Sequence, residues 1–203
     1  MSLYIPPARS SIFLDRGVKS CLAELMALHV MSVRIISASQ GDDTNPDPNQ
    51  VQVYHAKLYL ELLGTEKRVL CFDPTPGAFM QGNRFWGVIM ISECASAQAT
   101  INPETSVEFV QELTDGPTAA ELFEKLFDEE EMDKYLFTEG GTGCRHWCIT
   151  AIEKMIEWKY LPLKVKKEIE EWEYETHSKL GAKFPLPRLC GDFHKRSAPP
   201  LAE

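Results

Sequence analysis

The first half of the chain alternates between helical and strand-like patterns. A helix is predicted over residues 17–27, because its apolar residues recur three or four positions apart. The next segment, Val30–Ile36, is rich in β-branched residues and predicts a strand. Before the helix, residues 1–16 contain Pro6-Pro7 and Ser10-Ser11 and are expected to form a flexible arm. The polar, proline-containing segment Gly41–Asn49 predicts a mobile loop.

Three further strands are predicted from β-branched and aromatic runs separated by turn residues. They are Val51–Leu63, Lys67–Asp73 and Phe85–Glu93. The turns between them are expected at Gly64–Glu66 and Pro74–Asn83. A fourth segment, Ser106–Leu113, fits a strand or a helix, and we favour the strand.

The second half of the chain reads as helical. Thr118 and Glu121 have the spacing of a capping box, which predicts a helix start. A second helix is expected over Cys144–Trp158, directly after a glycine-rich turn. A last helix should begin with Pro162 at its first position and end at Gly181.

This order predicts an α+β fold, with a small antiparallel sheet packed against helices and a C-terminal helical extension. We expect one domain over residues 17–182 with its core at 51–158, followed by an extended tail over 183–203. The length of 203 residues and a hydrophobic content of 44% are sufficient for one substantial core.

The charge and the cysteine content narrow the range of possible functions. The chain has 21 basic and 30 acidic residues, giving a formal charge of −9. This balance argues against a nucleic-acid-binding surface. No apolar run approaches the ~20 residues that span a bilayer, and no signal peptide is visible. We therefore expect a cytoplasmic protein with six reduced cysteines and no integral membrane association.

Two residues suggest nucleophilic chemistry. Cys144 stands at a helix start, where backbone N–H groups and the helix dipole favour the thiolate. His55 lies near the start of a predicted strand. A cysteine at a helix start and a histidine on a strand are the minimum for a thiol nucleophile with its base.

A third group usually orients such a histidine. Cys71 and Asp73 are two positions apart on one strand and therefore share a face. Asp73 is the better candidate, because a carboxylate accepts the imidazole N–H, although it also suits a turn before Pro74. Both remain candidates. No cofactor is expected.

Zinc is the rival chemistry. Cys144 and Cys148 lie one helical turn apart, and Cys71 with His55 could complete a tetrahedral set. The close-spaced cysteine pairs typical of zinc sites are missing, and we expect no metal.

The segment Gly143-Cys144-Arg145-His146-Trp147 resembles the Asn-Cys-x-His-aromatic motif of permuted papain-like folds. These include the lecithin:retinol acyltransferase-like enzymes and the PPPDE peptidases, in which the catalytic histidine opens a strand and precedes the cysteine. Tyr54-His55 followed by Cys144 keeps that order. The resemblance covers roughly residues 51–158 and implies a permuted papain-like fold. More loosely, the whole chain resembles a family of uncharacterised fungal proteins, a likeness that implies no activity.

The chain departs from that pattern at two positions. Gly143 replaces the asparagine before the cysteine, and Cys71 stands where the acyltransferases have a second histidine. The acidic charge and the lack of an apolar anchor argue against a phospholipid substrate.

Two functions follow as hypotheses. The first is a cysteine-dependent hydrolase or acyltransferase acting on an amide, isopeptide or ester carbonyl of a peptide, an ester or a small acylated metabolite. The second is a catalytically inactive relative that acts as a protein-interaction module. The oligomeric state is left open.

Overall fold

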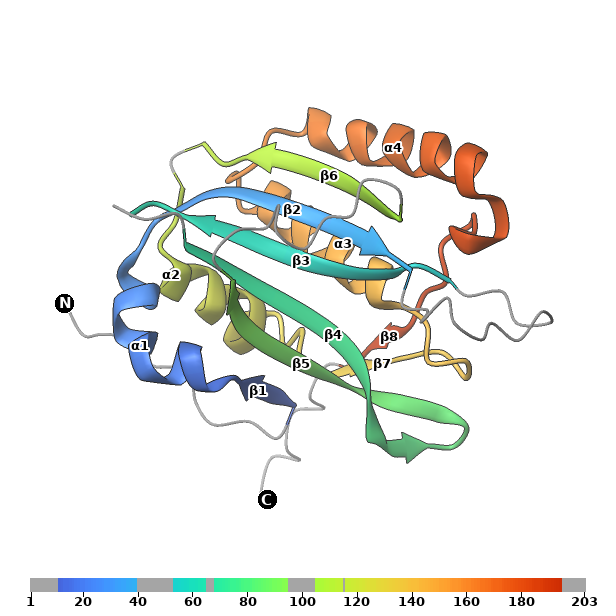
Figure 1. Cartoon of the computed structure of the whole chain (residues 1–203), viewed down its shortest axis with the longest axis horizontal. Coiled ribbons are helices and arrows are strands. Elements are labelled where there is room, and N and C mark those ends of the chain that lie inside the picture. Colours follow the sequence, from blue (N-terminus) through green and yellow to red (C-terminus); the bar gives the residue numbers. More distant parts are fainter. Residues whose placement is uncertain (1–10, 40–52, 65–67, 95–104, 115, 195–203) are drawn as a thin grey trace, which may run out of the picture.

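The computed structural model describes residues 11–39, 53–64, 68–94, 105–114 and 116–194. Figure 1 shows an α+β arrangement in which helices lie against one curled sheet. The expected fold class is confirmed at that level. The predicted polar loop at Gly41–Asn49 lies outside the described residues.

One sheet contains every strand of the described chain. Its order is β6-β2-β3-β4-β5-β7-β8, with antiparallel neighbours, and β1 pairs in parallel with β5. The strands are β1 (Ile12–Leu14), β2 (Val30–Ala38), β3 (His55–Leu62), β4 (Arg68–Gln81), β5 (Arg84–Cys94), β6 (Ser106–Glu112), β7 (Tyr135–Leu136) and β8 (Asp192–Phe193).

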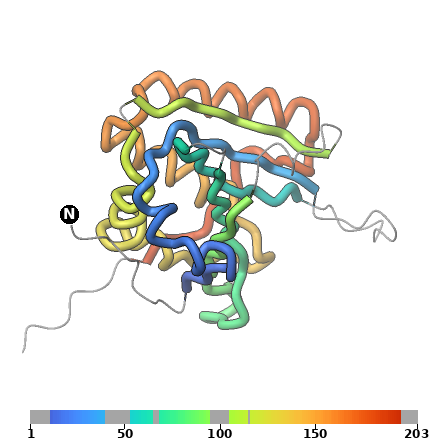
Figure 2. The backbone as a smooth tube through the Cα atoms, turned by 60° about the vertical axis from the view of Figure 1, so that its left-hand side comes forward, coloured from blue at the N-terminus to red at the C-terminus, as the bar shows by residue number. Residues whose placement is uncertain are grey.

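The helices cover one face and one edge of this sheet. Their bounds are α1 (Arg16–Ala27), α2 (Ala119–Phe123) continuing as the π-helical turn η2 (Glu124–Glu129), α3 (Cys144–Glu157), α4 (Lys164–Leu180) and the 3₁₀ turn η3 (Gly181–Lys183). Helix α3 packs under β3 and β4, while α4 lies beside β6 (Figure 1). The tube in Figure 2 shows the same layering from the side.

The core follows from the alternation of β3. Ala56, Leu58, Leu60 and Leu62 face the helices and belong to the main core. Tyr59, one position out of phase, lies on the opposite face in a second cluster with Ile36, Val69 and Cys71. The sheet therefore carries buried apolar residues on both faces, with the larger core on the side of α3.

Most predicted elements are confirmed. The helix at 17–27, the strand at Val30–Ile36 and the capping box of Thr118 with Glu121 are all present, as is the strand favoured at Ser106–Leu113. Gly181 caps α4 with a φ of 57°, as a glycine at this position allows.

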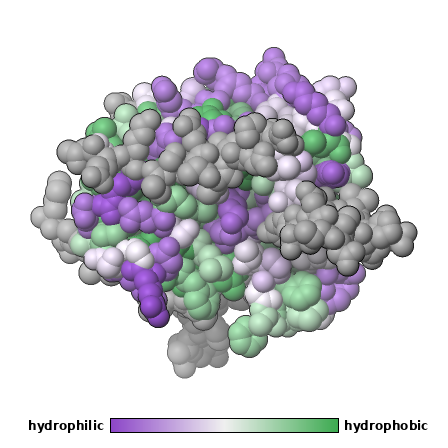
Figure 3. All heavy atoms as spheres, in the orientation of Figure 1, coloured by the Kyte–Doolittle hydropathy of each residue, from purple (hydrophilic) through white to green (hydrophobic). Residues whose placement is uncertain are grey.

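The predicted turn at Pro74–Asn83 is wrong. Strand β4 continues to Gln81, and the chain reverses only at Gly82 and Asn83. Pairing with β3 ends at Phe72, and beyond that point no described strand pairs with this edge of β4. Prolines are tolerated on such an edge because no ladder hydrogen bond is lost there. The resulting hairpin projects from the sheet and exposes Phe79 and Met80, where Figure 3 shows apolar residues.

Both chain ends are more ordered than expected, as far as they are described. Ile12–Leu14, within the predicted arm, form β1 because the Ser11 carbonyl and the following residues pair along β5. Residues 183–194 of the predicted tail dock through the buried Phe184 and through β8. Pairing of β1 and burial of Phe184 order these segments, although their proline content predicted a flexible arm and an extended tail.

Candidate functional site

The backbone around Cys144 is held by a buried tyrosine. Gly143 caps α3 with a φ of 135°, a conformation that side chains rarely adopt. The Tyr135 hydroxyl donates to the Gly143 carbonyl at 2.9 Å and accepts from the Gly191 N–H at 2.8 Å. The turn before the helix is thus fixed by a side chain from β7 and by the C-terminal segment.

The Cys144 sulfur is surrounded by donors. It accepts the backbone N–H of Ala56 at 3.2 Å and the N–H of Arg145 in the first turn of α3. Burial opposes ionisation, but the hydrogen bond and charge of His55 together with these two N–H groups outweigh it and lower the pKa of Cys144. The residue is 8% exposed. These contacts favour the thiolate form of Cys144 in a confined site.

His55 lies between Cys144 and Asp73. Its Nε2 is 2.6 Å from Asp73 Oδ1, and its ring also interacts with the Cys144 sulfur closely enough to change the pKa of both groups. Burial alone would lower the pKa of His55. The hydrogen bonds to Asp73 and Cys144, with their charges, instead raise it to about 9. The imidazole is accordingly protonated at neutral pH.

Asp73 is shared between two cations. Its second carboxylate oxygen, Oδ2, is 2.6 Å from Lys57 Nζ. Burial would raise the pKa of Asp73, but the hydrogen bonds to His55 and Lys57 lower it. Asp73 thus stays ionised and holds the imidazole ring in place.

The sequence candidates therefore separate into two groups. Cys144, His55 and Asp73 come together at the start of α3, whereas Cys71 lies two residues from Asp73 and contacts Tyr59 and Cys94 instead of His55. The zinc set of Cys144, Cys148, Cys71 and His55 does not converge. Among the described residues, no group of three or more His, Cys, Asp or Glu side chains is arranged to hold a metal.

The neighbours of Cys144 on α3 have structural roles. Cys148 is fully buried in the main core, and burial raises the pKa of its thiol. Trp147 is also in the core and donates from Nε1 to the Met132 carbonyl at 2.8 Å. His146 lies with Nδ1 at 3.1 Å from the Tyr135 hydroxyl, and burial lowers its pKa. The described surroundings of these three side chains are the core, Met132 and Tyr135.

Sequence reasoning missed several residues that shape the site. Lys57 could have been found, because it lies two positions after His55 and so shares its face of the strand. The buried ion pairs of Arg145 and Arg188 with Glu173 left no such signal, since they join α3, α4 and the C-terminal segment. Arg145 also stacks on Phe184 at 3.8 Å, which fastens that segment beside Cys144.

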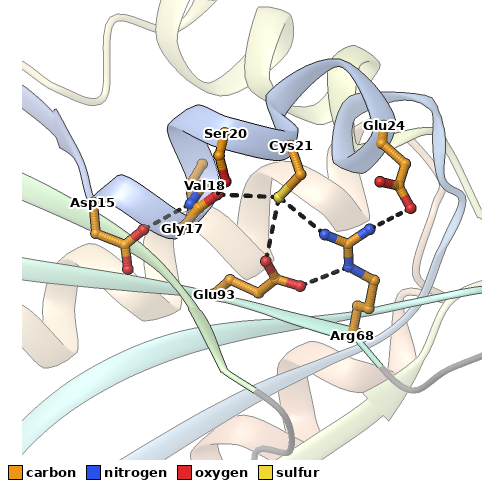
Figure 4. Close-up of polar contacts among 8 residues, drawn as sticks. All are labelled: Asp15, Gly17, Val18, Ser20, Cys21, Glu24, Arg68 and Glu93. Carbon is orange, nitrogen blue, oxygen red and sulfur yellow. Dashed lines mark hydrogen bonds and ion pairs between the residues drawn. The ribbon is translucent and has the colours of Figure 1, made fainter.

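Another cysteine has a charged partner but a different environment. Figure 4 shows Cys21 between Arg68 and Glu93: Arg68 Nη2 donates to its sulfur at 3.0 Å, and the thiol itself lies 3.4 Å from Glu93 Oε2. Burial and the Glu93 carboxylate raise the pKa of Cys21 despite the guanidinium. Proximity of an arginine alone does not make a thiolate here.

Comparison with known proteins gives a family without an assigned activity. No curated protein and no solved structure matches this chain. No helix in the described part of the chain is long and apolar enough to cross a membrane. One family model, the domain of unknown function DUF7770, matches residues 33–194, a span that holds His55, Asp73 and Cys144. The chain belongs to the DUF7770 family.

Proposed function

We propose that this protein is a cysteine-dependent hydrolase or acyltransferase acting on an amide, isopeptide or ester carbonyl. The observation that carries the proposal is the chain of contacts from Cys144 through His55 to Asp73. A thiol with a lowered pKa, an imidazolium beside it and a carboxylate that orients the ring are the groups that thiol catalysis requires. The histidine-before-cysteine order also resembles permuted papain-like enzymes.

The chemistry proceeds in two steps. The Cys144 thiolate attacks the carbonyl carbon, and the carbonyl electron pair moves to oxygen. The oxyanion then re-forms the carbonyl, the C–N or C–O bond to the leaving group breaks, and the His55 imidazolium protonates the departing amine or alkoxide, so that a thioester on Cys144 remains. In the second step, His55 removes a proton from water or from an acceptor alcohol or amine. That nucleophile cleaves the thioester and releases Cys144.

The helix start supplies stabilisation for the oxyanion. Backbone N–H groups in the first turn of an α-helix have no partner within the helix, and those beside Cys144 are available to hydrogen-bond the oxyanion that forms when Cys144 attacks a carbonyl. Gly143 permits this turn without a side chain that would collide with the Tyr135 hydroxyl. Gly143 therefore stands where the permuted papain-like motif has an asparagine, and it does not block the site.

A catalytically inactive relative that acts as an interaction module is the second candidate. The observation that favours it is the low exposure of the site: Cys144 is 8% exposed, and the side chain of His55 is 10% exposed. A substrate carbonyl reaches the sulfur only if covering side chains move.

Turnover assays separate the two candidates. The purified chain is offered activated esters, peptide amides and isopeptide-linked peptides, with and without an amine or alcohol acceptor. Hydrolysis or transfer that is lost in Cys144→Ser and in His55→Asn, together with a mass increase on Cys144 matching the acyl group, supports the enzyme. Absence of turnover and of acylation across these substrates, with a stable partner that still binds both variants, favours the interaction module.

A further inference from the structure

Two cysteines that do not contact His55 meet on the face of the sheet turned away from α3, the face that also carries Asp73. In the register of β4 and β5, Cys71 is paired with Ser92 and Cys94 with Val69, so the two cysteines occupy diagonal positions on one face. Cys71 belongs to the second apolar cluster, Cys94 packs against that cluster, and the two thiols influence each other's pKa. Two thiols from adjacent strands are therefore already in contact.

The two thiols differ in access. Cys71 is 4% exposed and packs under Tyr59. Cys94 lies at the end of β5 and is only partly buried. A small solute reaches Cys94 first, and Cys71 stands behind it.

A cation completes the cluster. The Lys57 ammonium, which also pairs with Asp73, lies close enough to both sulfurs to interact with their charges. The hydrogen bond from Cys71, aided by Ser92 and Lys57, lowers the pKa of the Cys94 thiol, and the same hydrogen bond with burial raises the pKa of Cys71. Cys94 therefore has the more acidic thiol of the pair, and Cys71 the less acidic one.

We propose that Cys94 and Cys71 form a peroxide-sensitive modification site, in which the more exposed Cys94 is the reactive thiol and the buried Cys71 behind it is the resolving thiol. The cluster has an accessible thiolate, a contacting second thiol and an adjacent cation, as redox-sensitive cysteines require. Cys21 lacks the second thiol and has a carboxylate beside its sulfur (Figure 4).

The reaction balances with hydrogen peroxide as the oxidant. The Cys94 thiolate attacks one peroxide oxygen, the O–O bond breaks, and hydroxide leaves with Cys94 oxidised to the sulfenic acid. The Cys71 thiol then attacks the Cys94 sulfur, the S–O bond breaks and water leaves, which forms the disulfide. Peroxide is reduced, and two thiols are oxidised. Diagonal positions on adjacent strands are slightly too far apart for a relaxed disulfide, so the strands move together by roughly 1 Å.

Peptide mapping after peroxide treatment tests the proposal. The Cys144→Ser variant is used, so that the nucleophile of the proposed function does not compete and the result is independent of that function. The protein is treated with limiting hydrogen peroxide, the remaining thiols are alkylated, and tryptic peptides are analysed by mass spectrometry. Trypsin cleavage at Arg84 separates Cys71 from Cys94.

The expected first product is a Cys71–Cys94 disulfide that dithiothreitol reverses, with Cys94 lost at least about tenfold faster than Cys21 or Cys190. In the Cys71→Ser background, Cys94 should instead accumulate as a sulfenic acid trapped by a cyclic dione. Cys21→Ser is the matched control and should leave the product unchanged. Oxidation of Cys94 no faster than that of Cys21, or a disulfide with any other cysteine, would overturn the proposal.

Discussion

The backbone N–H of Ala56 donates a 3.2 Å hydrogen bond to the Cys144 sulfur, so the residue after His55 contacts the same atom that the imidazole does. Strand β3 and helix α3 are 88 residues apart at this contact. The hydrogen bond fixes the end of β3 against the start of α3. His55 is thereby held beside the sulfur by the backbone as well as by Asp73.

Removing the Cys144 sulfur should lower the pKa of His55. In Cys144→Ser, His55 loses both the hydrogen bond and the negative charge of the sulfur, so its pKa should fall from about 9. Titration of the His55 ring resonances by NMR in the wild type and the variant measures this directly. Cys148→Ser, which changes a core thiol one helical turn away, is the matched control. An unchanged His55 pKa in Cys144→Ser would mean that the ring and the sulfur do not interact.

The pH dependence of stability should show a plateau. The raised pKa of His55 contributes stability below its ordinary value of 6.5, and this is lost as pH rises through about 9. The lowered pKa of Cys144 contributes stability above its ordinary value of 9.0, and this is lost as pH falls. Where the two ranges overlap, below about 9 and above the lowered pKa of Cys144, the two slopes have opposite signs and offset each other.

Unfolding by denaturant at a series of pH values measures this effect. The free energy of unfolding of the wild type, minus that of the Cys144→Ser, His55→Asn double variant, should be nearly constant over the part of the range from 6.5 to about 9 that lies above the lowered pKa of Cys144. A difference that rises or falls steadily across the window would contradict an ion pair between the two groups.

Asp73 should affect the reactivity of Cys144 more than Lys57 does. Asp73→Asn removes the charge that raises the pKa of His55, so we expect the alkylation rate of Cys144 at neutral pH to fall by about tenfold or more. Lys57→Met leaves the carboxylate on the ring and should cause a smaller loss. Alkylation kinetics followed at the Cys144 peptide compare the two variants. An equal rate in Asp73→Asn and wild type would remove Asp73 from the site.

Gly143 should tolerate no side chain. A Cβ there would lie 2.7 Å from the Tyr135 hydroxyl, and the φ of 135° disfavours any other residue. Gly143→Ala should destabilise the fold by about 1–3 kcal/mol. Gly140→Ala, where a Cβ meets no atom within 4 Å, is the control and should change the free energy of unfolding by less than about 0.5 kcal/mol. Chemical denaturation of both variants tests the difference, and equal stabilities would contradict the proposed role of the turn.

The sequence was most informative where local chemistry and periodicity agree. The helix start at Cys144 follows from its glycine-rich turn, and the pairing of Asp73 with a strand histidine is consistent with the alternation of β4. The choice between Asp73 and Cys71 needed the position of His55 relative to both, which depends on the register of β3 and β4. Periodicity gives the face of a strand but not its register.

Long-range anchors were not predictable from the sequence. The extension of β4 past Pro74 depends on where β3 stops pairing, and the docking of Phe184 depends on Arg145 of α3. In each case the decisive partner is distant in the chain. The pair of Cys71 and Cys94 was missed for the same reason. The environment of Cys94 is set by Cys71 and Lys57, which lie on other strands.

The most direct test of the central claim is the rate at which iodoacetamide alkylates Cys144 at neutral pH, measured by peptide mapping in the wild type and in His55→Asn. We expect Cys144 to react at least about tenfold faster in the wild type than in the variant, while Cys148, buried one turn further along α3, stays unmodified in both. A Cys144 as unreactive as Cys148 in the native protein, or one whose rate is the same without His55, would contradict an activated cysteine–histidine pair.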